Sequence, residues 1–196
     1  MNTFMDLLII FIGAAIVNNF VLTRFLGLCT FFGVSRKLEP SIGFGLAVIF
    51  VLGCSSALCW VLYEYVMKPY NLMFLKNIIF ILIIAAFVQL VEAVVRKMNP
   101  ALFKYLGVYL ILMASNCAVL APPLINIDKD YNFFQSVVQA VGSGAGFALA
   151  LILMSCIRER LEFSEVPESM RGMPISFIVA GLLALAFMGF TAMIKL

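Results

Sequence analysis

The sequence NNFVLTRFLGLC, residues 18–29, decides how the N-terminal part of the chain can fold. It follows the apolar run Leu7–Val17, which is too short to cross a bilayer, because a spanning helix needs roughly 20 apolar residues. Asparagine is costly in hydrocarbon unless its amide is hydrogen-bonded. The pair Asn18 and Asn19 therefore predicts that the first helix is interrupted inside the membrane.

A second apolar run ends in the same way. Val108–Ala114 stops shortly before Asn116, and Cys117 follows directly. The segments GFGLA (residues 43–47) and GAGFA (residues 144–148) are also alike. Matching interruptions in two halves of a membrane protein are typical of discontinuous helices within an internal repeat. We therefore expect the chain to consist of two related halves.

The composition predicts an integral membrane protein. Hydrophobic residues make up 64% of the chain and charged residues 12%, against about 45–50% and about 25% in soluble domains. The 196 residues suit one membrane domain, residues 1–196, without a soluble catalytic domain. The N-terminus has no basic region and no small-residue cleavage site, so we expect the first apolar run to remain in the mature protein.

Six spans are predicted, which makes the expected fold an all-α polytopic membrane protein. The apolar regions are Leu7–Leu22, Ile42–Val66, Leu72–Val95, Leu102–Leu120, Phe133–Ile157 and Ile175–Ile194. Three spans per half reverse the direction of the chain. The halves, approximately residues 1–97 and 98–196, are therefore predicted to be inverted repeats in which helices 1 and 4 are discontinuous half-helices.

The basic residues predict the orientation in the membrane. On the side of the two termini lie four of the 13: Lys68, Lys76, Lys129 and Lys195. The other nine are Arg24, Arg36, Lys37, Arg96, Lys97, Lys104, Arg158, Arg160 and Arg171. The positive-inside rule then places loops 1–2, 3–4 and 5–6 in the cytoplasm and both termini outside.

The cysteines are the candidate ligand residues, since the chain has no histidine for a haem, a metal or a general base. Cys54, Cys59 and Cys156 lie within ordinary apolar spans and are interpreted as small core residues. Cys29 and Cys117 each follow a helix break, so they are either core residues or ligands of an iron–sulfur cluster. Such a cluster normally takes four cysteines, and another chain would supply two.

Three other features have simpler interpretations. Asn18, Asn19 and Asn116 either hydrogen-bond the broken backbone, which we favour, or line an ion or cofactor site. Gly142, Gly144 and Gly146 are expected to permit close helix packing. The charged loop 158–174 is either a membrane-surface loop or a docking surface for a soluble partner.

Several stretches together resemble one known family. They are residues 18–29, Val34–Lys37, Asn116–Leu120, Tyr131–Phe133, Arg158–Arg160, Arg171-Gly172 and Phe187–Phe190. This family contains the A and E subunits of the Rnf ion-translocating electron-transport complex and the D and E subunits of the sodium-pumping NADH:quinone oxidoreductase. The resemblance runs almost end to end, and the double asparagine before Phe20 resembles the A subunit of Rnf.

The resemblance implies six spans in two inverted repeats and a place in the bacterial inner membrane. It implies one component, not catalytic alone, of a complex that couples ferredoxin:NAD electron transfer to Na⁺ or H⁺ translocation. Cys29 and Cys117 would ligate the iron of an intramembrane 2Fe–2S cluster shared with a homologous six-helix partner of opposite topology, which resembles the E subunit of Rnf. The residues expected beside the cluster are Asn19, Leu28, Asn116 and Ala118. The other expected partners are the B, C, D and G subunits of Rnf and membrane lipid, with no nucleic acid.

Two alternatives belong to other functional classes. A small secondary transporter would bind its substrate at the broken helices, and its cysteines would be incidental. A purely structural assembly protein would tolerate replacement of Cys29 and Cys117 without loss of electron transfer.

Overall fold

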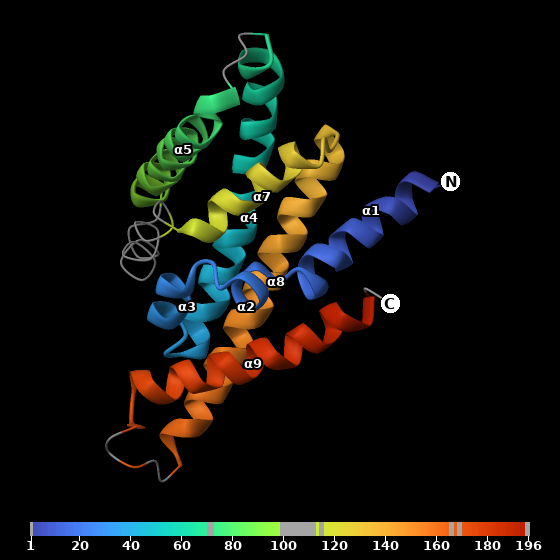
Figure 1. Ribbon diagram of the computed structural model, residues 1–196. Helices are drawn as coiled ribbons and strands as arrows, with labels where there is room; N and C mark the ends of the chain where they lie inside the picture. Colours follow the sequence, from blue (N-terminus) through green and yellow to red (C-terminus); the bar gives the residue numbers. More distant parts are fainter. Residues whose placement is uncertain are drawn as a thin grey trace.

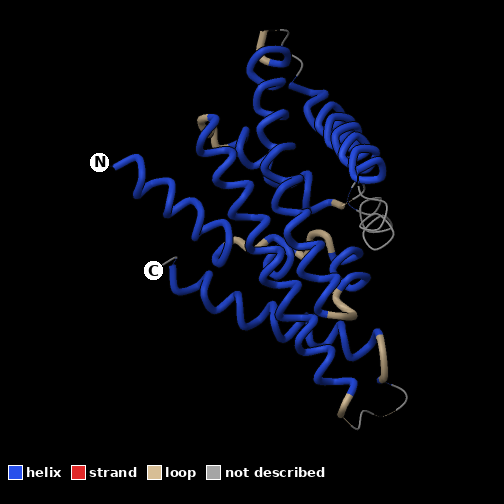
Figure 2. The backbone as a smooth tube through the Cα atoms, turned by 180° about the vertical axis from the view of Figure 1, so that it is seen from behind, coloured by secondary structure: helices blue, strands red, loops and turns tan. Residues whose placement is uncertain are grey.

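The structure is a computed structural model that describes residues 2–69, 73–98, 113, 116–164, 167 and 170–194. Throughout these residues the regular secondary structure is helical (Figures 1 and 2). The α-helices are α1 (Asn2–Ile12), α2 (Phe20–Arg24), α3 (Leu28–Val34), α4 (Leu38–Leu62), α5 (Lys76–Met98), α7 (Cys117–Asp128), α8 (Phe133–Glu162) and α9 (Met173–Ile194). Two π-helical segments, η1 (Gly13–Val17) and η2 (Tyr63–Met67), extend α1 and α4, and η3 (Met73–Leu75) is a 3₁₀ turn before α5. The predicted all-α fold is confirmed for this part of the chain.

Apolar helices of membrane length are present. Within the described residues, three are long and apolar enough to cross a bilayer: Leu38–Met67, Lys76–Val94 and Phe133–Glu162. Three shorter apolar helices are Met5–Val17, Cys117–Asp128 and Met173–Gly189. Each of the six overlaps one predicted span. The first half of the predicted fourth span, Val108–Ala114, lies outside the described residues apart from Met113, so the six spans and the inverted repeat stay predictions.

The surface of these helices is unusually apolar. Large side chains stand exposed along them, among them Leu46 (65%), Leu82 (69%) and Leu185 (67%). Soluble monomers rarely expose apolar patches of more than a few hundred Å². The exposed apolar side chains of a membrane helix face lipid or a neighbouring protein, so the surface agrees with a membrane location.

The centre of the molecule is the antiparallel crossing of α4 and α8 (Figure 1). A Cβ on Gly45 of α4 would lie 2.9 Å from the Cβ of Ala148, and one on Gly144 of α8 would lie 2.9 Å from the Cα of Ile49. The two backbones therefore approach as closely as glycine allows. This confirms the packing role predicted for Gly144.

The first helix packs on another part of α8 through the same device. A Cβ on Gly142 would lie 2.9 Å from the carbonyl oxygen of Phe11, and one on Gly146 would lie 2.5 Å from that of Ala15. Small-residue contacts of this kind let membrane helices associate closely. The predicted packing roles of Gly142 and Gly146 are confirmed, and α8 is the element against which α1, η1 and α4 are positioned.

Figure 2 shows loops at the ends of the long helices and also in the middle of the bundle, between η1 and α3. At one end the backbone N–H of Leu38 donates to Glu159 (2.9 Å), and Arg158 donates to the hydroxyl of Ser35 (2.9 Å). These bonds join loop 1–2 to the end of α8, as the predicted topology requires. Which end faces the cytoplasm stays a prediction.

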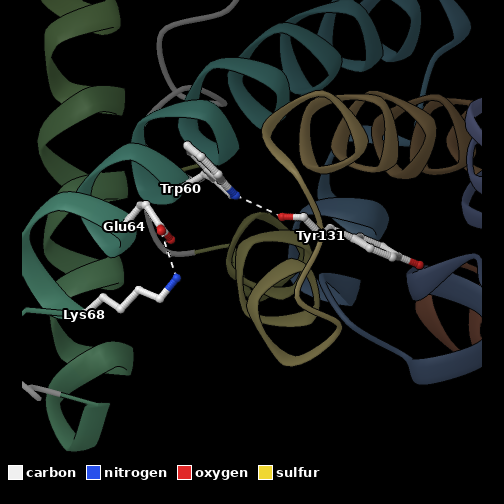
Figure 3. A network of polar contacts seen from close by, with 4 residues as sticks. All are labelled: Trp60, Glu64, Lys68 and Tyr131. Carbon is white, nitrogen blue, oxygen red and sulfur yellow. Dashed lines mark hydrogen bonds and ion pairs between the residues drawn. The ribbon is translucent and has the colours of Figure 1, made fainter. Parts of the chain in front are cut away.

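The opposite end carries an aromatic and charged rim (Figure 3). The indole N–H of Trp60 donates to the carbonyl oxygen of Tyr131 at 2.9 Å. Near it on the same helix end, Lys68 pairs with Glu64 at 2.8 Å. Tryptophan and tyrosine are enriched where membrane helices reach the headgroup region. This end therefore has the composition of a membrane–water interface.

Candidate functional site

The first helix break lies where the sequence predicts it. η1 ends at Val17, and Asn19 has extended backbone angles (φ −66°, ψ 108°) before α2 begins at Phe20. The Asn19 side chain accepts a hydrogen bond from the N–H of Val21 (3.2 Å) and donates one to the carbonyl oxygen of Gly146 (2.7 Å). Since Asn19 is only 1% exposed, its amide satisfies backbone groups that have no access to water.

The start of α7 repeats this arrangement. Asn116 has nearly the same backbone angles (φ −78°, ψ 114°), and its Oδ1 accepts from the N–H of Ala118 at 3.0 Å. Its Nδ2 donates to the hydroxyl of Thr30 at 3.1 Å, and that hydroxyl donates to the carbonyl oxygen of Gly27 at 2.9 Å. The favoured interpretation, hydrogen bonding of broken backbone, is confirmed for Asn19, and Asn116 caps the start of α7 in the same way.

Asn18 has a different position. It is exposed and lines a cavity of about 220 Å³ together with Arg24 and Gln139. The Gln139 side chain is 6% exposed, and its Oε1 has no hydrogen-bond partner among the described residues. Asn18 therefore does not share the capping role of Asn19, and the wall of this cavity contains an unused acceptor.

A left-handed turn brings the first break against the start of α7. After α2, Phe25 (φ 55°) and Gly27 (φ 79°) reverse the chain so that α3 starts beside α7. A Cβ on Gly27 would lie 2.6 Å from Oδ1 of Asn116 and 2.9 Å from the Cβ of Ala118. L-residues other than Asn and Asp rarely adopt this conformation. Glycine is required here by both the backbone angle and the contact.

The two candidate ligands lie on these two contacting segments. Cys29 is the second residue of α3, and Cys117 is the first residue of α7. Both cysteines are exposed. The interpretation of these two as buried core residues is therefore wrong, because the packed side of each segment is occupied by its neighbours, Thr30 and Ala118.

The depth of the site follows from its contacts with α8. The virtual Cβ of Gly27 lies 3.4 Å from the ring of Phe147, and Asn19 binds Gly146. Gly146 and Phe147 lie in the middle of the 30-residue helix α8. The first break and the start of α7 are therefore held at half the length of a membrane-length helix.

The residues predicted to surround the cysteines divide into two groups. Leu28, Asn116 and Ala118 are sequence neighbours of Cys29 or Cys117 and lie on the contacting segments. Asn19 instead belongs to the first break, where its side-chain hydrogen bonds go to η1, α2 and α8. Sequence reasoning missed Gly27 and Thr30. A glycine within a broken helix was a usable signal for the turn, whereas nothing local marks Thr30.

The other three cysteines have unlike surroundings. Cys59 is completely buried in α4, which confirms its interpretation as a core residue, and Cys54 is half-buried. Cys156 is exposed on α8. Its interpretation as a core residue is wrong, because its side chain lies on a part of the α8 surface that the described helices leave uncovered.

The donor set of the site is small. Among the described residues there is no group of three or more His, Cys, Asp or Glu side chains that could hold a metal ion. The site instead presents two exposed thiols on adjacent segments. Thiolate sulfur is a soft ligand, of the kind that iron–sulfur clusters, zinc and copper(I) prefer.

Comparison with known proteins identifies the family. The family described as "Rnf-Nqr subunit, membrane protein" matches residues 7–194. The chain is 54% identical over 189 residues to the A subunit of the proton-translocating ferredoxin:NAD(+) oxidoreductase complex of Clostridium ljungdahlii, covering 96% of this chain and 98% of that one. It is 50% identical, with the same coverage, to the A subunit of the Na(+)-translocating ferredoxin:NAD(+) oxidoreductase complex of Acetobacterium woodii. It is 49% identical over 190 residues to the A subunit of the ion-translocating oxidoreductase complex of Yersinia enterocolitica, covering 97% and 98%. These matches confirm the resemblance stated from the sequence, and the chain belongs to the Rnf-Nqr family of membrane protein subunits.

Proposed function

We propose that this chain is the membrane-embedded A subunit of an ion-translocating ferredoxin:NAD oxidoreductase complex and that it transfers electrons there. Relatives that align over nearly the whole chain are named as that subunit. One of them is named proton-translocating and another Na(+)-translocating, so the proposal covers either ion. The chain acts as one part of the enzyme and is not catalytic alone.

We further propose that Cys29 and Cys117 ligate a 2Fe–2S cluster within the membrane. The observation that carries this is the contact of their two segments through Gly27, Thr30 and Asn116, with both thiols exposed. These residues fit half of a cluster site, because a 2Fe–2S cluster needs four thiolates and this part of the chain presents two. A homologous partner of opposite topology, the E subunit of an Rnf complex, would supply the other two.

The chain's own residues prepare these ligands. Cys117 stands at the start of α7, where the free N–H groups and the helix dipole stabilise negative charge. Asn116 fixes the start of that helix, and its bond to Thr30 fixes the distance to α3. When bound, the cluster would supply one-electron transfer. The depth of the site would keep it away from water on both sides.

The proposed topology follows the predicted one. Six spans in two inverted repeats would lie in the bacterial inner membrane, with both termini outside and loops 1–2, 3–4 and 5–6 in the cytoplasm. The matching conformations of Asn19 and Asn116 support an internal repeat. Two helix breaks at the middle of α8 would provide a place where ion passage responds to charge at the cysteines.

The test is co-expression of the chain with its homologous partner, followed by absorption and electron paramagnetic resonance spectroscopy. Cys29→Ser and Cys117→Ser are each expected to abolish the 2Fe–2S signal. Cys156→Ser is the matched control, since Cys156 is also exposed but lies away from the breaks. A full signal in either of the first two variants removes that cysteine from the ligand set.

A secondary transporter is the second candidate function. The observation in its favour is the 220 Å³ cavity at the first break, where the Gln139 oxygen has no partner in the described part of the chain. This function predicts uptake by vesicles that contain the chain alone, which both serine variants would retain. A purely structural protein predicts unchanged electron transfer in both variants and no uptake.

A further inference from the structure

A second cavity, of about 650 Å³, lies where α8 ends and α9 begins. Three arginines from separate segments line it: Arg36 from the turn after α3, Arg158 from α8 and Arg171 from the residues before α9. One acidic side chain, Glu162, also lines it. We call this cavity the arginine pocket. Its walls carry an excess of positive charge.

That charge is not neutralised within the described residues. The ion pairs of Lys68 with Glu64 and of Lys76 with Asp128 do not involve the pocket arginines. The Arg158 guanidinium donates hydrogen bonds to two neutral acceptors, the carbonyl oxygen of Phe32 and the hydroxyl of Ser35, both at 2.9 Å.

Two features of the pocket therefore favour an anion. Arg36, Arg158 and Arg171 line one cavity, so three positive charges face the same space. The start of α9, a 22-residue helix whose first residues line the pocket, adds the positive end of a helix dipole. An anion in the pocket would relieve the repulsion between the guanidinium groups.

The other wall of the pocket is apolar. Met173 and Ile175, the first residues of the apolar helix Met173–Gly189, contribute to the lining. Three and seven residues after Ile175, and so on the same face of α9, Ile178 (48%) and Leu182 (61%) are exposed. A cationic pocket that continues into an exposed apolar helix matches a molecule with an anionic head and apolar chains.

We propose that the arginine pocket binds the phosphate group of an anionic membrane phospholipid, whose acyl chains lie along the exposed apolar side of α9. Basic pockets between membrane helices are suited to such headgroups. Free phosphate offers the same anion, but it would leave the apolar wall and α9 uncovered. This inference does not depend on the cluster proposed above.

The test measures lipid binding to the full chain by native mass spectrometry in detergent. Phosphatidylglycerol, phosphatidylcholine and inorganic phosphate are compared as ligands. Arg36→Gln and Arg171→Gln are expected to leave the fold intact because both side chains are exposed, and the melting temperature without lipid verifies this. Arg160→Gln is the matched control, an exposed arginine on α8 that does not line the pocket.

Phosphatidylglycerol should bind more tightly than phosphatidylcholine, and each pocket substitution should weaken its binding about fivefold. The Arg160→Gln variant should bind as the unchanged chain does. Equal binding of the two lipids, or an equal loss in Arg160→Gln, would overturn the proposal. Displacement of phosphatidylglycerol by millimolar inorganic phosphate would also overturn it, because the pocket would then be a site for the free anion.

Discussion

Asn116 donates a hydrogen bond from Nδ2 to the hydroxyl of Thr30 at 3.1 Å, across 86 positions of sequence. This bond joins the segment that carries Cys117 to the segment that carries Cys29. Both of its partners are buried, Thr30 at 2% and Asn116 at 6% exposure. The distance between the two candidate ligands therefore depends on a polar contact shielded from water.

Replacement of the Thr30 hydroxyl tests this link. Thr30→Val is similar in size but leaves Nδ2 of Asn116 and the carbonyl oxygen of Gly27 without this partner. A buried unsatisfied group costs about 1–3 kcal/mol. We expect a loss of this size in the free energy of unfolding, together with a weaker cluster signal in the co-expressed pair. Thr30→Ser keeps the hydroxyl and should retain both the stability and the cluster signal. If Thr30→Val also retained both, the bond would not position the site.

The turn at Gly27 predicts a difference between two glycines with positive φ. Gly27→Ala would bring a Cβ to 2.6 Å from Oδ1 of Asn116 in addition to a strained backbone, whereas Gly172 has nothing within 4 Å. The backbone strain alone costs about 1–2 kcal/mol. We expect Gly172→Ala to lower the free energy of unfolding by about this amount, and Gly27→Ala to lower it further. Equal losses in denaturant unfolding would contradict the contact at Gly27.

The two neighbouring asparagines at the first break should respond differently. Asn19→Ala removes the cap on Val21 and the donor to Gly146, both buried, so the expected destabilisation is about 1–3 kcal/mol. Asn18 is exposed, and Asn18→Ala should change the free energy of unfolding by no more than about 0.5 kcal/mol. Thermal unfolding of both variants in the same detergent makes the comparison. Equal losses would mean that the break does not depend on the Asn19 amide.

The ion pair at the end of α4 predicts a shifted pKa for Lys68. The hydrogen bond and charge of Glu64 raise the pKa of Lys68 (Figure 3). Because the folded pKa lies above the unfolded one, the pair contributes to stability below the unfolded pKa, and this contribution disappears as the pH rises through the folded pKa. Glu64→Gln should return the Lys68 pKa toward its ordinary value, as measured by NMR of labelled lysine. High salt should reduce the shift in the unchanged chain, since the pair is exposed.

Much of the fold could be predicted because it depends on local properties. Long apolar runs predict membrane helices, and described helices lie where these runs are. The position of the first break could be predicted from asparagine in apolar sequence, since an amide in hydrocarbon must find a partner. The packing of Gly142, Gly144 and Gly146 followed from their spacing and was confirmed. The exposure of Cys156 could not be predicted, because apolar sequence does not distinguish the side of a helix that faces lipid from the side that faces protein.

The sequence by itself therefore determined the membrane class, the apolar helices and the place where the first predicted span is interrupted. Only the tertiary structure decided that the residues around Gly27 and Thr30 meet Asn116 at the middle of α8. The physical reason is that a helix break depends on the residues of the segment in which it occurs. The partner of each amide is set by the packing of helices that lie far apart in the chain.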